Sequence, residues 1–142
     1  VPESLIPSLL EVSVRHKLFS AAGKILEKMQ DYEKAMGLYL FSNLDRNIEH
    51  AVELAEKLYK DNPQKVKEIA KAAIYSLIGE PDKAFEIVKQ YLGKYEKDVR
   101  EKIENPWKYS ISVDGVPFLV AEQLAKKYGL YDMIPEIEKR ER

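Results

Sequence analysis

The sequence contains no cysteine, which excludes a disulfide framework and a thiolate metal site. It also lacks an apolar run of the roughly 18 residues that a membrane-spanning helix needs, and a signal-peptide pattern is missing at its start. The formal net charge is only −1, so the field of the whole molecule does not favour an anionic membrane or nucleic acid. We therefore expect a cytoplasmic protein without a membrane partner.

Motifs of catalysis and of metal binding are missing as well. There is no glycine-rich phosphate loop and no Gly-x-Ser-x-Gly elbow. The two histidines, His16 and His50, stand far apart in the sequence, whereas zinc sites need three or four ligands with short local spacings. Glu49, Glu53 and Glu56 are followed by lysines at helical spacing, which is typical of a solvated helix face. We predict no catalytic residue, no metal and no cofactor, and we expect both histidines at the surface.

What the sequence does contain is enough apolar material for a core. Apolar residues make up 45% of the 142 residues, and charged residues make up 33%, mostly lysine and glutamate. Such a lysine- and glutamate-rich composition is associated with hyperthermophile proteins. The chain starts with Val1-Pro2 and has no initial methionine, so we expect a piece of a longer polypeptide. Within it, residues 1–142 are expected to form a single domain.

Apolar residues recur at steps of three and four along most of the chain, which predicts amphipathic helices. Residues 48–59 give the clearest example, and Pro63 and Pro81 each mark the first turn of a further helix. A stripe from Ala84 to Ile103 would lie on a helix about 35 Å long if residues 82–104 were continuously helical. Connections of two to five residues force successive helices to run antiparallel. We predict an all-α fold of about seven or eight helices, stacked as hairpins in a short right-handed α-solenoid.

One segment departs from this pattern. In residues 105–117, Asn105-Pro106 ends a helix, apolar and polar residues alternate, and Asp114-Gly115 is a turn dipeptide. The segment is predicted to be a non-helical insertion. It carries Trp107 and Tyr109, and aromatic residues on loops are common anchors of interfaces. The alternative is that Trp107 fills the gap between the preceding helix and the final hairpin, as a lone tryptophan usually packs.

Residues 16–42 resemble a tetratricopeptide hairpin. The resemblance rests on aromatic and small residues at the family's positions and on the turn between its two helices. The matching residues are Phe19, Ala22-Gly23, Leu26, Asp31-Tyr32-Glu33-Lys34-Ala35 and Tyr39. Similar turns begin at residues 30, 79 and 129, but their spacing exceeds the family's 34 residues. The chain is therefore similar to a divergent tetratricopeptide or clathrin-type helical repeat, and α-helical repeats of this kind imply a binding scaffold.

The resemblance also indicates where a partner would bind. Tetratricopeptide hairpins commonly bind peptides along the face of their first helices, and some use a lysine and asparagine clamp on a carboxylate. Ser20 and Lys24 occupy the corresponding positions here, so the clamp pattern is not met. A solvated helix face is the alternative for this surface. The candidate partner-binding residues are Lys17, Ser20, Lys24, Glu27 and Lys28 on the first hairpin, with Trp107 and Tyr109 in the insertion.

We therefore predict a protein–protein interaction or scaffolding module, a docking or sensor arm that binds a protein or peptide. The second hypothesis is a nucleic-acid-associated helical domain, because a small net charge can conceal a local basic stripe. Its candidate members are Arg15, Lys17, Lys24 and Lys28. An enzyme is the least favoured class. Homo-oligomerisation through an open end of the solenoid is compatible with each of these functions.

Overall fold

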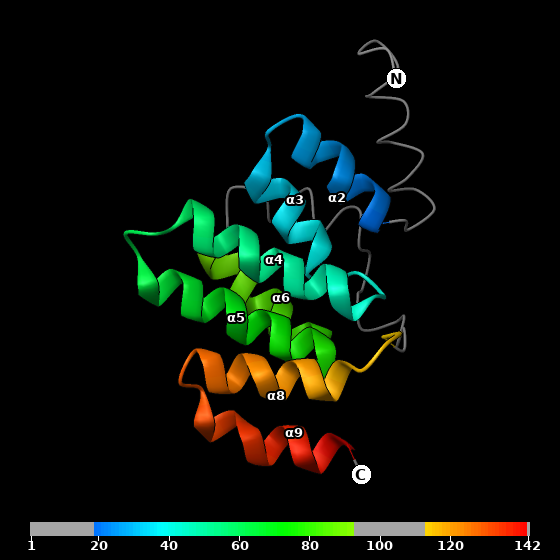
Figure 1. The fold of residues 1–142 in the computed structure, drawn as a ribbon, viewed down its shortest axis with the longest axis vertical. Helices are drawn as coiled ribbons and strands as arrows, with labels where there is room; N and C mark the ends of the chain where they lie inside the picture. Colours follow the sequence, from blue (N-terminus) through cyan, green and yellow to red (C-terminus); the bar gives the residue numbers. More distant parts are fainter. Residues whose placement is uncertain (1–18, 93–112, 142) are drawn as a thin grey trace.

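The computed structural model describes residues 19–92 and 113–141, and every regular element in these ranges is helical (Figure 1). The elements are α2 (Phe19–Lys28), α3 (Tyr32–Tyr39), α4 (Asp45–Leu58), α5 (Pro63–Leu77), α6 (Pro81–Tyr91), α8 (Pro117–Lys127), the 3-10 helix η4 (Tyr131–Met133) and α9 (Ile134–Glu141). No strand occurs in the described ranges, where Leu44 and Asp114 form an isolated β-bridge. The predicted all-α class is confirmed.

Helix α5 lies at the centre of the packing. It contacts α4 and α6, its neighbours in the sequence, and also α8. On one side the stack continues from α4 through α3 to α2, and on the other side from α8 to α9, while α6 lies behind α4 and α5 (Figure 1). Alanines let the neighbouring helices approach α5 closely, since Ala70, Ala72 and Ala73 are fully buried. Ile69 and Ile74 fill the remaining space and are fully buried as well.

Local signals in the sequence account for several helix starts. Asp31 caps α3, because its carboxylate accepts a hydrogen bond from the amide of Lys34 at 3.4 Å. Asn62 caps α5 in the same way, accepting from the amide of Lys65 at 3.2 Å. Each side chain satisfies one of the amides that the first turn of a helix leaves without an intrahelical partner. Pro63 then occupies the first turn of α5, where a missing N–H costs nothing.

The three turns that the sequence places near residues 30, 79 and 129 have the same backbone geometry. Gln30, Gly79 and Gly129 adopt φ values of 63°, 84° and 69°. After each of them, the next amide donates to the carbonyl five residues earlier, which is the bond of a Schellman helix end. These bonds join Asp31 N to Leu26 O, Glu80 N to Tyr75 O and Leu130 N to Ala125 O, at 2.9, 2.8 and 2.7 Å. The three turns are therefore equivalent in conformation, although their spacing is irregular.

Gln30 is the only one of the three that bears a side chain in this left-handed conformation. We expect Gln30→Gly to raise the free energy of unfolding by about 1 kcal/mol. Relief of a left-handed strain of ~1–2 kcal/mol is partly offset by the greater freedom of glycine in the unfolded chain. Urea unfolding followed by circular dichroism measures the change. Gly129→Gln is the reverse control and should destabilise by a similar amount, because nothing lies within 4 Å of an added Cβ there. An unchanged or lower midpoint for Gln30→Gly would contradict the expectation.

Two segments differ from the simple helical pattern. The stripe from Ala84 to Ile103 does not form one continuous helix, because α6 ends at Tyr91 and Leu92 leaves helical geometry at φ −121° and ψ 34°. Gly93 follows directly and is a poor helix former. Residues 113–116 are not helical and lie against the start of α4, where the amide of Asp114 donates to the carbonyl of Asn43 at 2.8 Å. Pro117, the last residue of the predicted non-helical insertion, already belongs to α8 (Pro117–Lys127), because proline suits the first turn of a helix. Residues 105–112 of the insertion lie outside the described residues.

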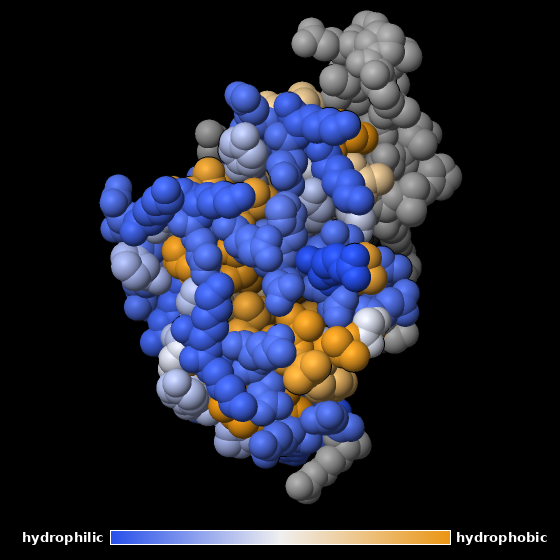
Figure 2. Space-filling model, in the orientation of Figure 1, coloured by the Kyte–Doolittle hydropathy of each residue, from blue (hydrophilic) through white to orange (hydrophobic). Residues whose placement is uncertain are grey.

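The surface varies along the stack. Figure 2 shows mostly hydrophilic residues over α2, α3 and α4, and more hydrophobic surface over α5 and α8. The apolar side chains most exposed near the start of α8 are Val116 and Leu119. Within the part of the chain that the structure describes, no helix combines the length and the apolar character needed to cross a membrane.

Candidate functional site

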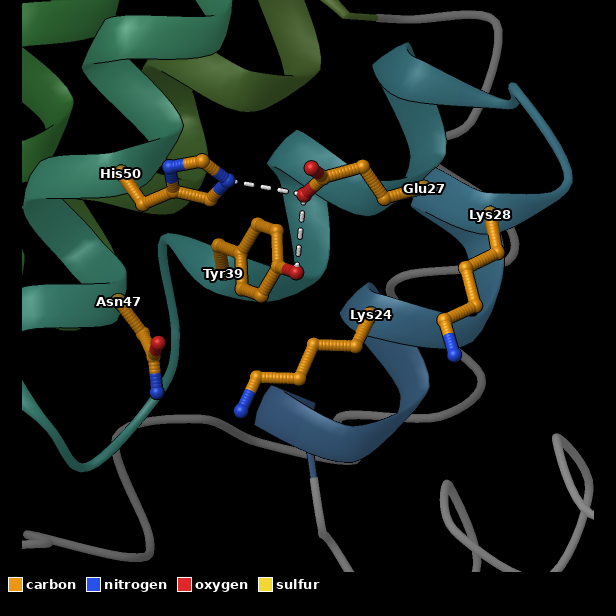
Figure 3. A pocket seen from close by; sticks show the side chains of 6 residues that line it. All are labelled: Lys24, Glu27, Lys28, Tyr39, Asn47 and His50. Atoms are coloured by element: carbon orange, nitrogen blue, oxygen red, sulfur yellow. Dashed lines mark hydrogen bonds and ion pairs between the residues drawn. The ribbon is translucent and has the colours of Figure 1, made fainter.

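An open pocket of about 330 Å³ lies where α2, α3 and α4 meet (Figure 3). Helix α2 supplies charged side chains, α3 supplies an aromatic ring, and α4 supplies an amide and an imidazole. The lining residues are Lys24, Glu27, Lys28, Tyr39, Asn47 and His50. Three of the residues predicted to bind a partner, Lys24, Glu27 and Lys28, thus share one concave surface.

The pocket depends on the close approach of α2 to α3. Gly23 faces the ring of Tyr39, and a Cβ atom at Gly23 would lie only 2.6 Å from Tyr39 Cε1. Tyr39 itself is 1% exposed, so its ring forms the floor between the two helices. Its hydroxyl donates to Glu27 Oε1 at 3.1 Å. Burial, together with this neighbouring carboxylate, raises the pKa of Tyr39 well above its ordinary value, so the hydroxyl stays protonated and can donate.

Glu27 joins all three helices. The same oxygen that accepts from Tyr39 lies 2.8 Å from His50 Nε2, and the ring of His50 meets that of Tyr39 edge-on at 5.2 Å between centroids. Figure 3 shows Glu27 reaching from α2 to both partners. His50 Nδ1 lies 3.2 Å from Glu53 Oε2, one turn further along α4. Residues that are 12 and 23 positions from Glu27 in the sequence are thereby held together.

The two contacts of His50 define its charge. A neutral imidazole has one N–H and can donate to only one carboxylate, whereas the imidazolium has two and can donate to both. The contacts to Glu27 and Glu53 therefore fit the protonated form. Burial disfavours that form, but the hydrogen bonds to the two carboxylates outweigh burial and raise the pKa of His50 above its ordinary 6.5. The side chain is 32% exposed, so solvent screens these interactions in part.

This raised pKa predicts a dependence of stability on pH. A group whose pKa is higher in the folded state stabilises fully below its unfolded pKa, near 6.5, and loses that contribution as pH rises through the folded pKa. We therefore expect the free energy of unfolding, measured in urea, to decrease as the pH rises above about 6.5, by less than about 1 kcal/mol because the pair is partly exposed. His50→Gln should flatten this part of the profile. A slope that persists in His50→Gln would assign the dependence to another group.

Ser20 has a different environment from the lysines of α2. Its hydroxyl lies 2.8 Å from Ser42 Oγ and accepts from Asn47 Nδ2 at 2.6 Å. The amide of Leu44 also donates to Ser42 Oγ, at 3.2 Å. This group of polar side chains joins α2 to the turn before α4 and fixes Asn47 at the edge of the pocket. Ser20 therefore supports a pocket residue and is not among the lining residues.

Lys24 and Lys28 are the cations of the pocket. They lie one turn apart on α2 and are both exposed. Among the described residues, neither ammonium forms an ion pair. In Figure 3, Lys24 extends toward the side of α4 that carries Asn47, and the end of Lys28 points away from Glu27. The pocket thus combines a carboxylate that already has two partners with two lysines available to an outside anion.

The structure places the predicted site residues unevenly. It brings Lys24, Glu27 and Lys28 together, whereas Lys17, Trp107 and Tyr109 lie outside the described residues.

Sequence reasoning missed two pocket residues and gave a third another role. Asn47 belongs to no motif of the sequence, the sequence predicts a surface position for His50, and Tyr39 stands out only as the second-helix aromatic residue of the tetratricopeptide resemblance. The spacing of three between Asn47, His50 and Glu53 on one side of α4 is the signal that points to this face.

A second group of charges lies far from the pocket, where α9 meets the start of α6. Glu80 is paired with Lys83 at 3.4 Å and with Arg140, and Lys83 also reaches Glu136 at 3.2 Å. Burial disfavours the charged form of Glu80, but hydrogen bonds from its neighbours outweigh burial and lower the pKa of Glu80. Two cations therefore neutralise the Glu80 carboxylate. Because these ion pairs join residues at the start of α6 to residues of α9, the cluster links the two helices. No cluster of three or more potential metal ligands occurs among the described residues.

Comparison of the chain with protein-family models, with curated proteins and with solved structures finds no match.

Proposed function

We propose that the chain is a protein-docking module built from tetratricopeptide-like helical hairpins, and that a partner polypeptide binds at the pocket between α2, α3 and α4. The observation that carries the proposal is the pocket itself, in which Lys24 and Lys28 have no ion-pair partner among the described residues. In this proposal the module acts as a docking or scaffolding arm of a larger protein, without catalysis of its own. Its helices serve as a rigid support for the lining side chains.

Two properties of the pocket support docking. Its floor is rigid, because Tyr39 is buried against Gly23 and its hydroxyl is held by Glu27. Its rim is charged and exposed, so a partner can reach it without a change of fold. A preformed surface of this kind avoids the entropic cost of ordering on binding.

Nucleic acid is the second candidate, and the pocket favours it less. Of the four residues of the hypothetical basic stripe, Lys24 and Lys28 are described, and Glu27 lies between them on the same helix. A phosphate backbone needs an extended run of cations, whereas this pocket alternates charge. Arg15 and Lys17 lie outside the described residues.

The docking function is tested by affinity capture from the source cell with the full chain as bait. We expect Lys24→Ala/Lys28→Ala to lose a partner that the unmodified bait retains. The matched control is Lys67→Ala/Lys71→Ala, which removes a lysine pair at the same spacing on α5, away from the pocket. Nuclease treatment separates a protein partner from one bridged by nucleic acid. Equal capture by both variants would refute docking at this pocket, and loss of the partner on nuclease treatment would favour the second candidate.

A further inference from the structure

We propose that the pocket binds a carboxylate group of an acidic peptide segment through Lys24 and Lys28, and that protonation of His50 controls this binding. The proposal rests on the docking function and specifies both the chemistry of the partner and the regulation of the site.

The available charges are positive. Glu27 already accepts hydrogen bonds from Tyr39 and His50, so its charge is largely compensated inside the pocket. Lys24 and Lys28 lack such compensation among the described residues. An incoming carboxylate therefore meets two free ammonium groups and a neutralised glutamate. Charge complementarity of this kind steers binding and suppresses partners of the wrong sign.

The dimensions favour a short acidic segment. A pocket of about 330 Å³ accommodates a carboxylate-bearing side chain with part of its backbone, at the lower end of the range for small-ligand sites. The buried ring of Tyr39 supplies an apolar floor, and the amide of Asn47 borders the opposite edge on α4. Aspartate and glutamate side chains combine a short apolar stem with a carboxylate, which matches this arrangement.

His50 is the group of the pocket that titrates near neutral pH. The groups around it are Glu27, Lys24 and Lys28 from α2, Tyr39 from α3 and Glu53 from α4 itself. Arg46 stands four residues before His50 in the sequence of α4. Of these residue types, only histidine has an ordinary pKa between pH 5 and pH 8. When His50 is neutral, one of its two carboxylate contacts loses its proton donor and Glu27 is no longer compensated. Glu27 then repels a ligand carboxylate and competes for the lysine ammonium groups.

The consequence is a binding affinity that decreases as pH rises through the pKa of His50. Linkage requires the reverse effect as well, so that a bound anionic peptide raises the pKa of His50. The same histidine thus connects occupancy of the pocket with the contact between α2 and α4. These two effects distinguish a proton-controlled site from a pair of exposed lysines on a helix.

The probe for the test is a hexa-aspartate peptide labelled at its N-terminus with tetramethylrhodamine, a dye that does not titrate between pH 6 and pH 8.5, so the charge of the probe is nearly constant over this range. Fluorescence anisotropy with the full chain should show affinity falling several-fold from pH 6 to pH 8.5. His50→Gln retains a donor for Glu27 and should give a flat profile. Lys24→Gln/Lys28→Gln should lose at least ten-fold in affinity at pH 6, and Lys67→Gln/Lys71→Gln should bind like the unmodified chain. The pKa of His50, followed by NMR, should rise when the peptide is added.

Three outcomes would overturn the inference: equal binding by the two lysine variants, a pH dependence that persists in His50→Gln, or no binding of the peptide at pH 6. A single-stranded oligonucleotide of equal charge that binds more tightly than hexa-aspartate would instead assign the lysines to nucleic acid. If capture of a cellular partner depends on Lys24 and Lys28 but hexa-aspartate does not bind, the docking function stands and the acidic-peptide inference fails. Circular dichroism of each variant confirms that the fold is retained.

Discussion

Gly23→Ala is expected to lower the free energy of unfolding by about 2 kcal/mol. The added methyl group would lie 2.6 Å from Tyr39 Cε1 and 2.8 Å from Cδ1, well inside contact distance. The ring cannot yield easily, because Tyr39 is buried and its hydroxyl is tied to Glu27. Overpacking costs up to about 3 kcal/mol, and the better helix propensity of alanine returns about 1 kcal/mol of it. At an open position of α2, the same change would therefore be stabilising.

Two companion substitutions separate the steric contact from other causes. Tyr39→Phe keeps all the ring atoms that Gly23 faces, so it should not rescue Gly23→Ala. Tyr39→Leu removes them and should make the second substitution less costly than in the native background. Urea unfolding monitored by circular dichroism provides the four free energies of each double-mutant cycle. Strictly additive effects of Gly23→Ala and Tyr39→Leu would show that the two residues do not oppose each other.

The same substitution has a consequence for the pocket. Tyr39 and His50 share one oxygen of Glu27, so displacing the ring disturbs the contact between Glu27 and His50. We therefore expect Gly23→Ala to move the pKa of His50 back toward its ordinary value. The small residue at position 23 thus determines both how closely α2 approaches α3 and how the charges of the pocket are arranged.

The parts of the fold that the sequence predicts are those that depend on neighbouring residues. Pro63 and Pro81 mark the starts of helices because proline suits the first turn, and both stand at the first position of their helix. The turn at Gly79 is recognisable because glycine accepts the left-handed conformation. The turn at Gln30 has the same geometry without the glycine, and it is identified from the acidic and aromatic residues that follow it. Such signals require no knowledge of the rest of the chain.

The pocket depends on information that periodicity does not carry. Lys24, Glu27 and Lys28 are identifiable as one face of a helix, but the face across from them is set by how α2 and α4 are rotated about their axes. His50 lies on the polar side of α4 and contacts Glu27. The sequence pattern of α4 would be identical if the His50 side chain faced water instead. Only the three-dimensional packing distinguishes the two. Helix α8 packs against α5 although α6 lies between them in the sequence. This neighbour, too, cannot be predicted from the periodicity of the individual helices.

The contact between residues 113–116 and the start of α4 is a further long-range feature, and it leads to the largest expected effect. The amide of Val116 donates to Asp45 Oδ2 at 2.9 Å, and the amide of Asp45 donates to the carbonyl of Asp114 at 3.2 Å. Gly115 lies between these bonds with φ at +103°. Asp45 is buried, so its carboxylate depends on this partner. The segment thereby holds the first turn of α4, the helix that carries Asn47 and His50 into the pocket.

Gly115→Ala should lower the free energy of unfolding by about 3 kcal/mol. Backbone strain at a positive φ contributes ~1–2 kcal/mol, and the loss of the hydrogen bond to a buried carboxylate adds ~1–3 kcal/mol. That bond is lost because a Cβ atom at residue 115 would overlap the carboxylate group of Asp45. Thermal and urea unfolding measure the loss, and one-dimensional NMR shows whether the fold is retained.

Gly79→Ala is the matched control for this prediction. Gly79 also has a positive φ, +84°, but nothing lies within 4 Å of an added Cβ there. Its substitution therefore measures the backbone strain alone, about 1 kcal/mol. The difference between the two variants reports the contact with Asp45. Asp45→Ser should reduce that difference, because the shorter side chain leaves room for the methyl group. If Gly115→Ala and Gly79→Ala cost the same, the carboxylate of Asp45 does not hold the segment against α4, and the start of that helix must be fixed by its packing on α3 and α5.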